Sequence, residues 1–261
     1  MPEGEMDSNN IVQGLWVGSV LPTMQRLSIS SFIANGHTYH LYCYDELQGV
    51  PDGVRVKDAS QILPRSSICT HEKYDTYAAP FSDMFRYRLL LEHGGLWADT
   101  DVVCLRPFRF TNEYVFSSEH RLLHGVMREV PTITVMKAPS GASFLEELYE
   151  EVNKLGRSFQ WNDSGAGPLN RMIDKYSLHN FVERASVFCP LPTSLFERVV
   201  KENVQFSFEK TTCAIHLWHE LWRRAKLNVD ATFAAASLYE QLKRQYLEGA
   251  AIRPEAHFVL E

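Results

Sequence analysis

Residues 81–107 read FSDMFRYRLLLEHGGLWADTDVVCLRP, and this stretch decides the fold. A helix is expected over 82–93, because Ser82 is a good N-cap residue and apolar residues follow it at helical spacing. The Gly-Gly pair at 94–95 ends the helix, and a strand is expected over 96–101. Both elements should be roughly 16 Å long, at about 1.5 Å per helical residue and about 3.3 Å per strand residue.

The reversal of the chain at the glycine pair should place the start of the helix beside the end of the strand. Asp83 and Arg86 lie one helical turn apart. Asp99 and Asp101 end the strand and point to the same side if it stays extended. Two carboxylates this close repel each other unless a cation lies between them, and carboxylate oxygens suit Mg²⁺ or Mn²⁺. The stretch therefore predicts that these four charged side chains converge on a cation.

A structural reading of the same residues stays open. An Asp-x-Asp sequence is common in turns and solvated loops, and Asp83 with Arg86 could form a plain surface ion pair. The strand context favours a binding site instead, because ligands of α/β sheets bind at the carboxyl ends of the strands.

The rest of the chain starts with a β-α-β pattern, which indicates an α/β layer fold with a largely parallel, mixed sheet flanked by helices. Residues 70–81 are expected to form a loop, and no linker divides the chain. We expect a flexible N-terminus over 1–10 and a single domain over 11–261 that ends in a helical segment. Strands are expected at 11–17, 38–44, 54–56, 114–117, 132–136 and 211–218, and helices at 22–35, 143–155, 168–176 and 231–248.

Composition narrows the class of protein. The chain has 261 residues and a formal charge of −6, from 26 Lys and Arg against 32 Asp and Glu, which argues against nucleic acid or bulk anionic lipid as the main partner. The first ten residues are polar and acidic, unlike a signal peptide, and no run of about 18 apolar residues occurs. We therefore expect a cytoplasmic protein.

The five cysteines of the chain include no Cys-x-x-Cys pair, which favours reduced thiols over a zinc site or disulfides.

The pattern S-D-x-x-R-Y-x-x-L-x-x-x-G-G-x-x-x-D-x-D over 82–101 resembles that of DXD-containing sugar transferases, a family that includes fungal Golgi α-1,6-mannosyltransferases, glucosylating bacterial toxins and bacterial capsule and lipopolysaccharide enzymes. Residues 11–18 are similar to the family's opening strand, and 214–222, AIHLWHELW, to its closing segment. The resemblance implies a GT-A fold and a retaining glycosyltransferase of polysaccharide biosynthesis that uses a nucleotide-sugar donor and a divalent metal.

The resemblance also implies roles for single residues. Asp101 would bind the metal directly, and His216 would complete the metal shell. Asp99 would contact the donor ribose or sugar, or the metal through water. Asp83 and Arg86 would hold hydroxyls of the donor sugar. Because imidazole is a more natural ligand of Mn²⁺ than of Mg²⁺, His216 favours manganese slightly.

Two further segments resemble family features. Trp16 would stack on the nucleobase, with core filling as the alternative. The loop 162–168, NDSGAGP, is similar to the family's Gly-Pro loop, but Ala166 replaces the usual hydroxyl residue, so its role stays open between approach to phosphate or acceptor and an ordinary turn.

The substrates follow from the resemblance only in outline. A UDP-sugar is the favoured donor, with a GDP-sugar as the alternative, and the acceptor would be a glycan or a lipid-linked glycan. The competing interpretation is a non-catalytic nucleotide- or sugar-binding protein on the same fold. A two-metal phosphoester hydrolase would need more clustered ligands than this sequence offers. Weak contact with the inner face of the membrane is expected through a C-terminal segment, namely Trp218, Leu221, Trp222, Arg223 and Arg224.

Overall fold

The computed structural model describes residues 10–68, 70–71, 76–77, 79–156, 163–248 and 258–260. The N-terminus expected over 1–10 therefore falls almost wholly outside the described residues, as do Cys69 and Asn162.

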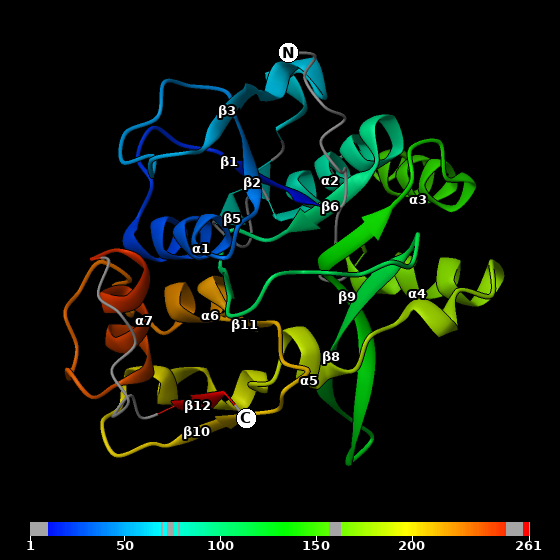
Figure 1. Ribbon diagram of the computed structural model, residues 1–261. Helices are drawn as coiled ribbons and strands as arrows, with labels where there is room; N and C mark the ends of the chain where they lie inside the picture. The colour runs from blue at the N-terminus through cyan, green and yellow to red at the C-terminus, as the bar shows by residue number, and fades with distance from the viewer. Residues whose placement is uncertain are drawn as a thin grey trace.

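A six-stranded sheet forms the centre of the molecule, with strand order β3-β2-β1-β6-β9-β8 (Figure 1). Neighbours from β3 to β6 pair in parallel, whereas β9 pairs antiparallel with both β6 and β8. The strands are β1 Ile11–Trp16, β2 Thr38–Cys43, β3 Arg55–Asp58, β6 Gly95–Ala98, β8 Val115–Leu123 and β9 Val126–Ala138. The predicted α/β class, with a mixed and mostly parallel sheet flanked by helices, is confirmed.

Shorter strands pair outside this sheet, β4 with β5, β7 with β11 and β10 with β12. These strands are β4 Thr70–His71, β5 Thr76–Tyr77, β7 Val102–Cys104, β10 Phe206–Phe208, β11 Ala214–His216 and β12 Phe258–Leu260. The α-helices are α1 Thr23–Ala34, α2 Ala79–His93, α3 Ser143–Lys154, α4 Ala166–Lys175, α5 Ala185–Phe188, α6 His219–Arg224 and α7 Leu238–Tyr246. Short 3-10 helices lie at Ala59–Gln61, Arg65–Ser67 and His179–Phe181, and a longer one at Thr193–Val200.

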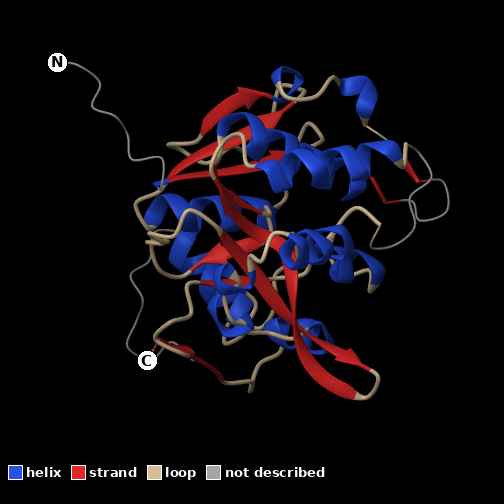
Figure 2. Ribbon diagram, turned by 90° about the vertical axis from the view of Figure 1, so that its right-hand side faces the viewer, coloured by secondary structure: helices blue, strands red, loops and turns tan. Residues whose placement is uncertain are grey.

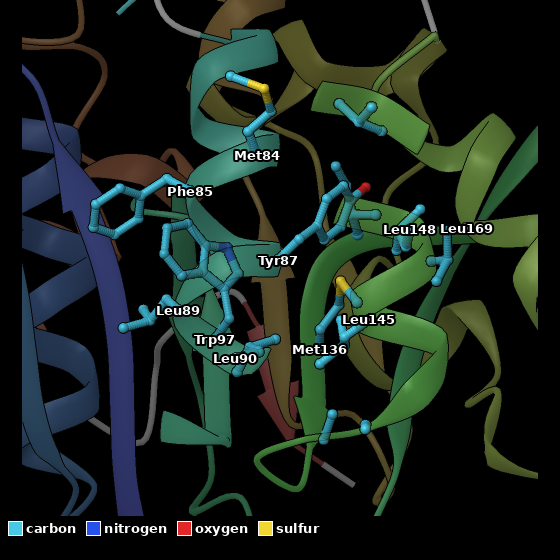
Figure 3. Close-up of a cluster of buried hydrophobic side chains, with 14 of the residues drawn as sticks. Met84, Phe85, Tyr87, Leu89, Leu90, Trp97, Met136, Leu145, Leu148 and Leu169 are labelled. Carbon is cyan, nitrogen blue, oxygen red and sulfur yellow. The ribbon is translucent and has the colours of Figure 1, made fainter. Parts of the chain in front are cut away.

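Helices bury both faces of the sheet, as Figure 2 shows from the side. Alternate residues of a strand point to opposite faces, so Leu96 packs with the side chains of α1 while Trp97 packs with those of α2. Figure 3 shows Trp97 among the apolar side chains of α2, with Leu145 and Leu148 of α3 farther out. This burial on two faces fixes β6, and with it the chain segment that follows.

The expected strand 96–101 is wrong in its second half. β6 ends at Ala98, and residues 99–102 form a turn in which the amide of Val102 donates to the carbonyl of Asp99 at 3.0 Å. Asp is favoured at the first position of such turns, and the chain must turn here because β7 leaves the main sheet to pair with β11.

Helix boundaries also differ from expectation. Helix α2 starts at Ala79, so Ser82 lies inside it rather than at its N-cap. Of the loop expected over 70–81, residues 70–71 and 76–77 form the paired strands β4 and β5, residues 79–81 belong to α2, and the others lie outside the described residues. The closing helix expected over 231–248 is only α7, because Ser237 caps it, and the amide of Phe233 turns back to donate to Glu240 Oε1 at 2.9 Å. Strands 114–117 and 132–136 are the inner parts of the longer hairpin β8–β9.

Candidate active site

Helix α2 and strand β6 bring three of the predicted side chains into direct contact. Arg86 lies between two carboxylates, with Nη2 at 3.1 Å from Asp83 Oδ1 and Nη1 at 2.9 Å from Asp99 Oδ1. Its Nη1 also donates to the carbonyl of Ile133 on β9 at 2.6 Å. The predicted approach of helix start and strand end is therefore confirmed. A guanidinium that is 3% exposed and held at three points is a rigid support for both acids.

Asp83 is anchored by a residue to which the sequence assigned no role. The hydroxyl of Ser164 donates to Asp83 Oδ2 at 2.7 Å, and the hydroxyl of Tyr87 holds the carbonyl of Ser164 at 2.8 Å. Burial raises the pKa of Asp83 above its ordinary value, while the charge of Arg86 and the Ser164 bond oppose that rise. The sequence marked the loop before α4 only as a segment similar to a family loop, because which hydroxyl faces α2 depends on how α4 packs.

Asp99, Asp101 and His216 form a cluster whose three ligand atoms lie within 4.8 Å of one another. His216 Nε2 is 3.2 Å from Asp101 Oδ2. Strand β11 pairs antiparallel with β7, and this pairing sets His216 opposite Val102, next to Asp101. The turn after β6 and the pairing of β7 with β11 together build a three-ligand site from distant parts of the chain.

Asp101 has a second, structural task. Its Oδ2 accepts the backbone amide of His219 at 2.8 Å, at the first residue of α6. Burial would raise the pKa of Asp101, but the His216 ring and the His219 amide together hold it well below its usual range. Burial likewise opposes protonation of His216, yet the charge of Asp101 raises the pKa of its imidazole well above 6.5. The two groups form an ion pair.

The pKa of the neighbouring carboxylate, Asp99, is shifted in the opposite direction. Burial, followed by the charge of Asp101, raises the pKa of Asp99 to about 6, although Arg86 opposes the shift. The indole Nε1 of Trp97 donates to Asp99 Oδ1 at 2.9 Å, and the Arg86 guanidinium lies over the Trp97 ring, 5.0 Å from its centroid. Sequence analysis missed Trp97 as a site residue, although its position two residues before Asp99 was the available signal.

Trp16 stands at the end of β1, beside the cluster rather than in it. It is half-buried, its Nε1 donates to the carbonyl of Val20 at 3.0 Å, and its ring centroid is 6.4 Å from that of His219. Stacking of Trp16 on a nucleobase stays a prediction.

One of the residues expected to contact a membrane is buried, and contact through the others stays a prediction. Trp222 is completely buried against Phe233 and Tyr239, since its spacing in α6 directs it into the core. Arg223 and Arg224 both form ion pairs with Glu220. The expectation that Trp222 reaches a membrane is wrong. Within the described residues, no helix combines the length and apolar character needed to cross a membrane.

Several solved structures resemble this one at low identity. The "PaToxG Glycosyltransferase" is 14% identical, with 64% of this chain and 69% of that chain covered and a TM-score of 0.47. The ligand-free glycosyltransferase domain from the YGT toxin is 9% identical, with 71% and 81% covered and a TM-score of 0.44. Its UDP-bound form is 10% identical, with 89% and 81% covered and a TM-score of 0.38. No curated protein matches the sequence.

A family model matches part of the chain. Residues 23–120 match the model described as "Glycosyltransferase sugar-binding region containing DXD motif". Asp83, Arg86, Asp99 and Asp101 lie inside the matched range, whereas Trp16 and His216 lie outside it. The resemblance drawn from the sequence is thus supported by an independent comparison: residues 23–120 are similar to the sugar-binding region of the DXD-containing glycosyltransferases.

Proposed function

We propose that this protein is a retaining, metal-dependent glycosyltransferase that moves a hexosyl group from a nucleotide diphosphate, most favourably UDP, to a glycan or lipid-linked acceptor. The single observation that carries the proposal is the Asp99–Asp101–His216 cluster, in which Asp99 is ion-paired with Arg86. Both aspartates and Arg86 lie inside the matched DXD region. Retention and the choice of UDP are supported by the sequence resemblance alone.

The donor atoms of the cluster fit a divalent cation. Two carboxylates and one imidazole suit Mn²⁺ better than Mg²⁺, which prefers an all-oxygen shell. Asp101 and His216 would hold the ion directly, and Asp99 directly or through water. When bound, the ion would stabilise the negative charge that builds up on the diphosphate leaving group.

The chain's own residues would orient the donor. Asp83 Oδ1 is ion-paired with Arg86 and Oδ2 accepts a hydrogen bond from Ser164, and each oxygen keeps a lone pair for a sugar hydroxyl. Arg86 would keep Asp83 and Asp99 at fixed spacing and would add positive charge beneath the donor. Trp16 would cover the base.

A front-face route, with the acceptor entering beside the leaving group, follows from how the three site carboxylates are used. Asp83 and Asp99 are both paired with Arg86, and Asp101 is bonded to His216 and to the His219 amide. Each of the three would thus be committed to holding the donor or the metal, which supports the front-face route.

The test is a thermal unfolding screen with UDP- and GDP-sugars, each with and without Mn²⁺, followed by a donor-hydrolysis assay. A ligand present at about 100 times its Kd should stabilise the fold by about 2.7 kcal/mol. Asp101→Asn should abolish the Mn²⁺-dependent shift and the hydrolysis, whereas Asp174→Asn, at an exposed carboxylate paired with His179, should change neither.

Two results would redirect the proposal. Wild-type protein that binds no nucleotide or nucleotide sugar in the presence of metal would refute it. Metal-dependent nucleotide binding with no turnover of any donor, across a broad acceptor panel, would instead favour the non-catalytic binding protein on the same fold.

A further inference from the structure

The outer end of the β8–β9 hairpin is an exposed apolar surface. Both views show it reaching out from the body of the molecule (Figures 1 and 2). Residues 122–129 are all exposed, and they include four large apolar side chains with exposed fractions of 67% at Leu122, 40% at Leu123, 54% at Val126 and 53% at Met127. These are four of the six exposed large hydrophobic residues in the part of the chain that the structure describes.

The register of the hairpin excludes burial in the protein's own core as the reason for these residues. Leu122 is paired with Met127, and Leu123 with Val126. Successive residues of a strand point to opposite faces, so one apolar pair lies on each face of the hairpin. A strand that packs on a core is apolar on one face and polar on the other. Here both faces are apolar and both are open to solvent.

The outermost part of the hairpin carries basic residues, with one acid on either side of it. Between Glu119 and Glu129, the segment 120–128 reads HRLLHGVMR and contains two arginines, two histidines and no acid, in a chain whose formal charge is −6. Arg121 lies directly opposite Arg128 in the register, and like charges in that position weaken strand pairing. Arg121 is ion-paired with Glu119, whose side chain is 5% exposed, so the positive charge next to the apolar tip comes mainly from Arg128.

We propose that this hairpin tip docks on an anionic lipid bilayer. Apolar side chains on both faces can enter the boundary between headgroups and acyl chains, while Arg128 beside them keeps its charge among lipid phosphates. Charge complementarity decides for this occupant: a basic, apolar tip on an otherwise acidic protein fits a negatively charged apolar interface. The proposal does not depend on the proposed transferase activity.

The experiment is co-sedimentation of the full chain with vesicles of phosphatidylcholine, with and without phosphatidylglycerol. Binding is expected to the anionic vesicles and to weaken as salt rises. Leu122→Asp with Met127→Asp should lower the partition coefficient at least about tenfold, because an apolar pair is replaced by two charges that the lipid repels. Arg128→Gln should lower it about fivefold, the equivalent of one basic residue near the surface. Val56→Asp, at a 50% exposed apolar residue on β3, is the matched control and should bind like wild type.

Several outcomes would overturn the proposal. Wild-type protein that stays in the supernatant with both vesicle types would do so, as would a loss of binding in Val56→Asp equal to that of the tip variant. If the double variant shows a lowered unfolding midpoint, Arg128→Gln tests the proposal in its place, and unchanged lipid binding in Arg128→Gln would then refute it. A concentration-dependent dimer in sedimentation velocity that Leu122→Asp dissolves would make a second copy of the chain the occupant, and would refute the lipid assignment.

Discussion

Gly14 offers a quantitative test of the packing beneath the candidate site. It lies in β1, and a Cβ atom there would stand 2.4 Å from the hydroxyl of Tyr39, 3.2 Å from the carbonyl of Ala98 and 3.3 Å from Cγ2 of Thr100. Tyr39 is fully buried, and its hydroxyl has no hydrogen-bond partner among the described residues. Gly14→Ala is therefore expected to overpack the site and to destabilise the fold by about 2 kcal/mol.

A second substitution should relieve that clash. Tyr39→Phe removes an unpartnered buried hydroxyl and should stabilise the protein by about 1 kcal/mol, since the cost of desolvating that group disappears. In this background the 2.4 Å contact is gone, and Gly14→Ala should cost about 1 kcal/mol or less. The expected coupling energy between the two substitutions is thus about 1–2 kcal/mol, in the direction of rescue.

The assay is a double-mutant cycle measured by urea unfolding. Tyr42→Phe serves as the control partner, because its hydroxyl points to Gln13 Oε1 at 3.4 Å rather than to Gly14, and its combination with Gly14→Ala should be additive. Additivity between Gly14→Ala and Tyr39→Phe, within about 0.3–0.5 kcal/mol, would refute the reasoning.

Three other changes probe charge and metal binding. Arg86→Met leaves buried carboxylates without their cation and should lower the free energy of unfolding by about 3–5 kcal/mol; a loss below about 1 kcal/mol in urea unfolding would contradict this. Burial lowers the pKa of His37, and burial followed by neighbouring cations lowers that of His40 to about 4, so the unfolded chain binds protons at higher pH than the folded one. Stability should hold above about pH 6.5 and fall as the pH drops toward 4, and His40→Gln should flatten that slope in acid titrations followed by circular dichroism. His216→Ala should abolish the Mn²⁺-induced rise in unfolding midpoint, and a wild-type Mn²⁺ titration curve in this variant would count against the proposed ligand set.

The contact between helix α2 and the end of β6 could be predicted from sequence because its causes are local. The helical repeat and the chain reversal at the glycine pair bring Arg86 next to Asp99, even though α2 is longer and β6 shorter than expected. The same holds for the β-α-β start, which depends on periodic burial within single elements.

Features that depend on distant partners were missed or mistaken. The turn at 99–102 exists because β7 pairs with β11, more than a hundred positions away. Ser164 reaches Asp83 only because α4 packs where it does, and Trp222 is buried by Phe233 and Tyr239 from a segment that the sequence assigned to a longer helix. In each of these cases tertiary contact outweighed the local pattern.

Asp101 and His216 are separated by 115 positions, and this separation bears on how the protein matures. A fragment that ended near residue 120 would contain the whole aspartate motif yet lack the imidazole that completes the cluster. Contacts of such long range are slow to form, because much of the polypeptide must be ordered before the contacts stabilise the fold. Cation affinity should thus appear only once the C-terminal part of the chain has folded against the N-terminal part. Metal binding during refolding would then report when the strand that carries His216 has paired next to Asp101.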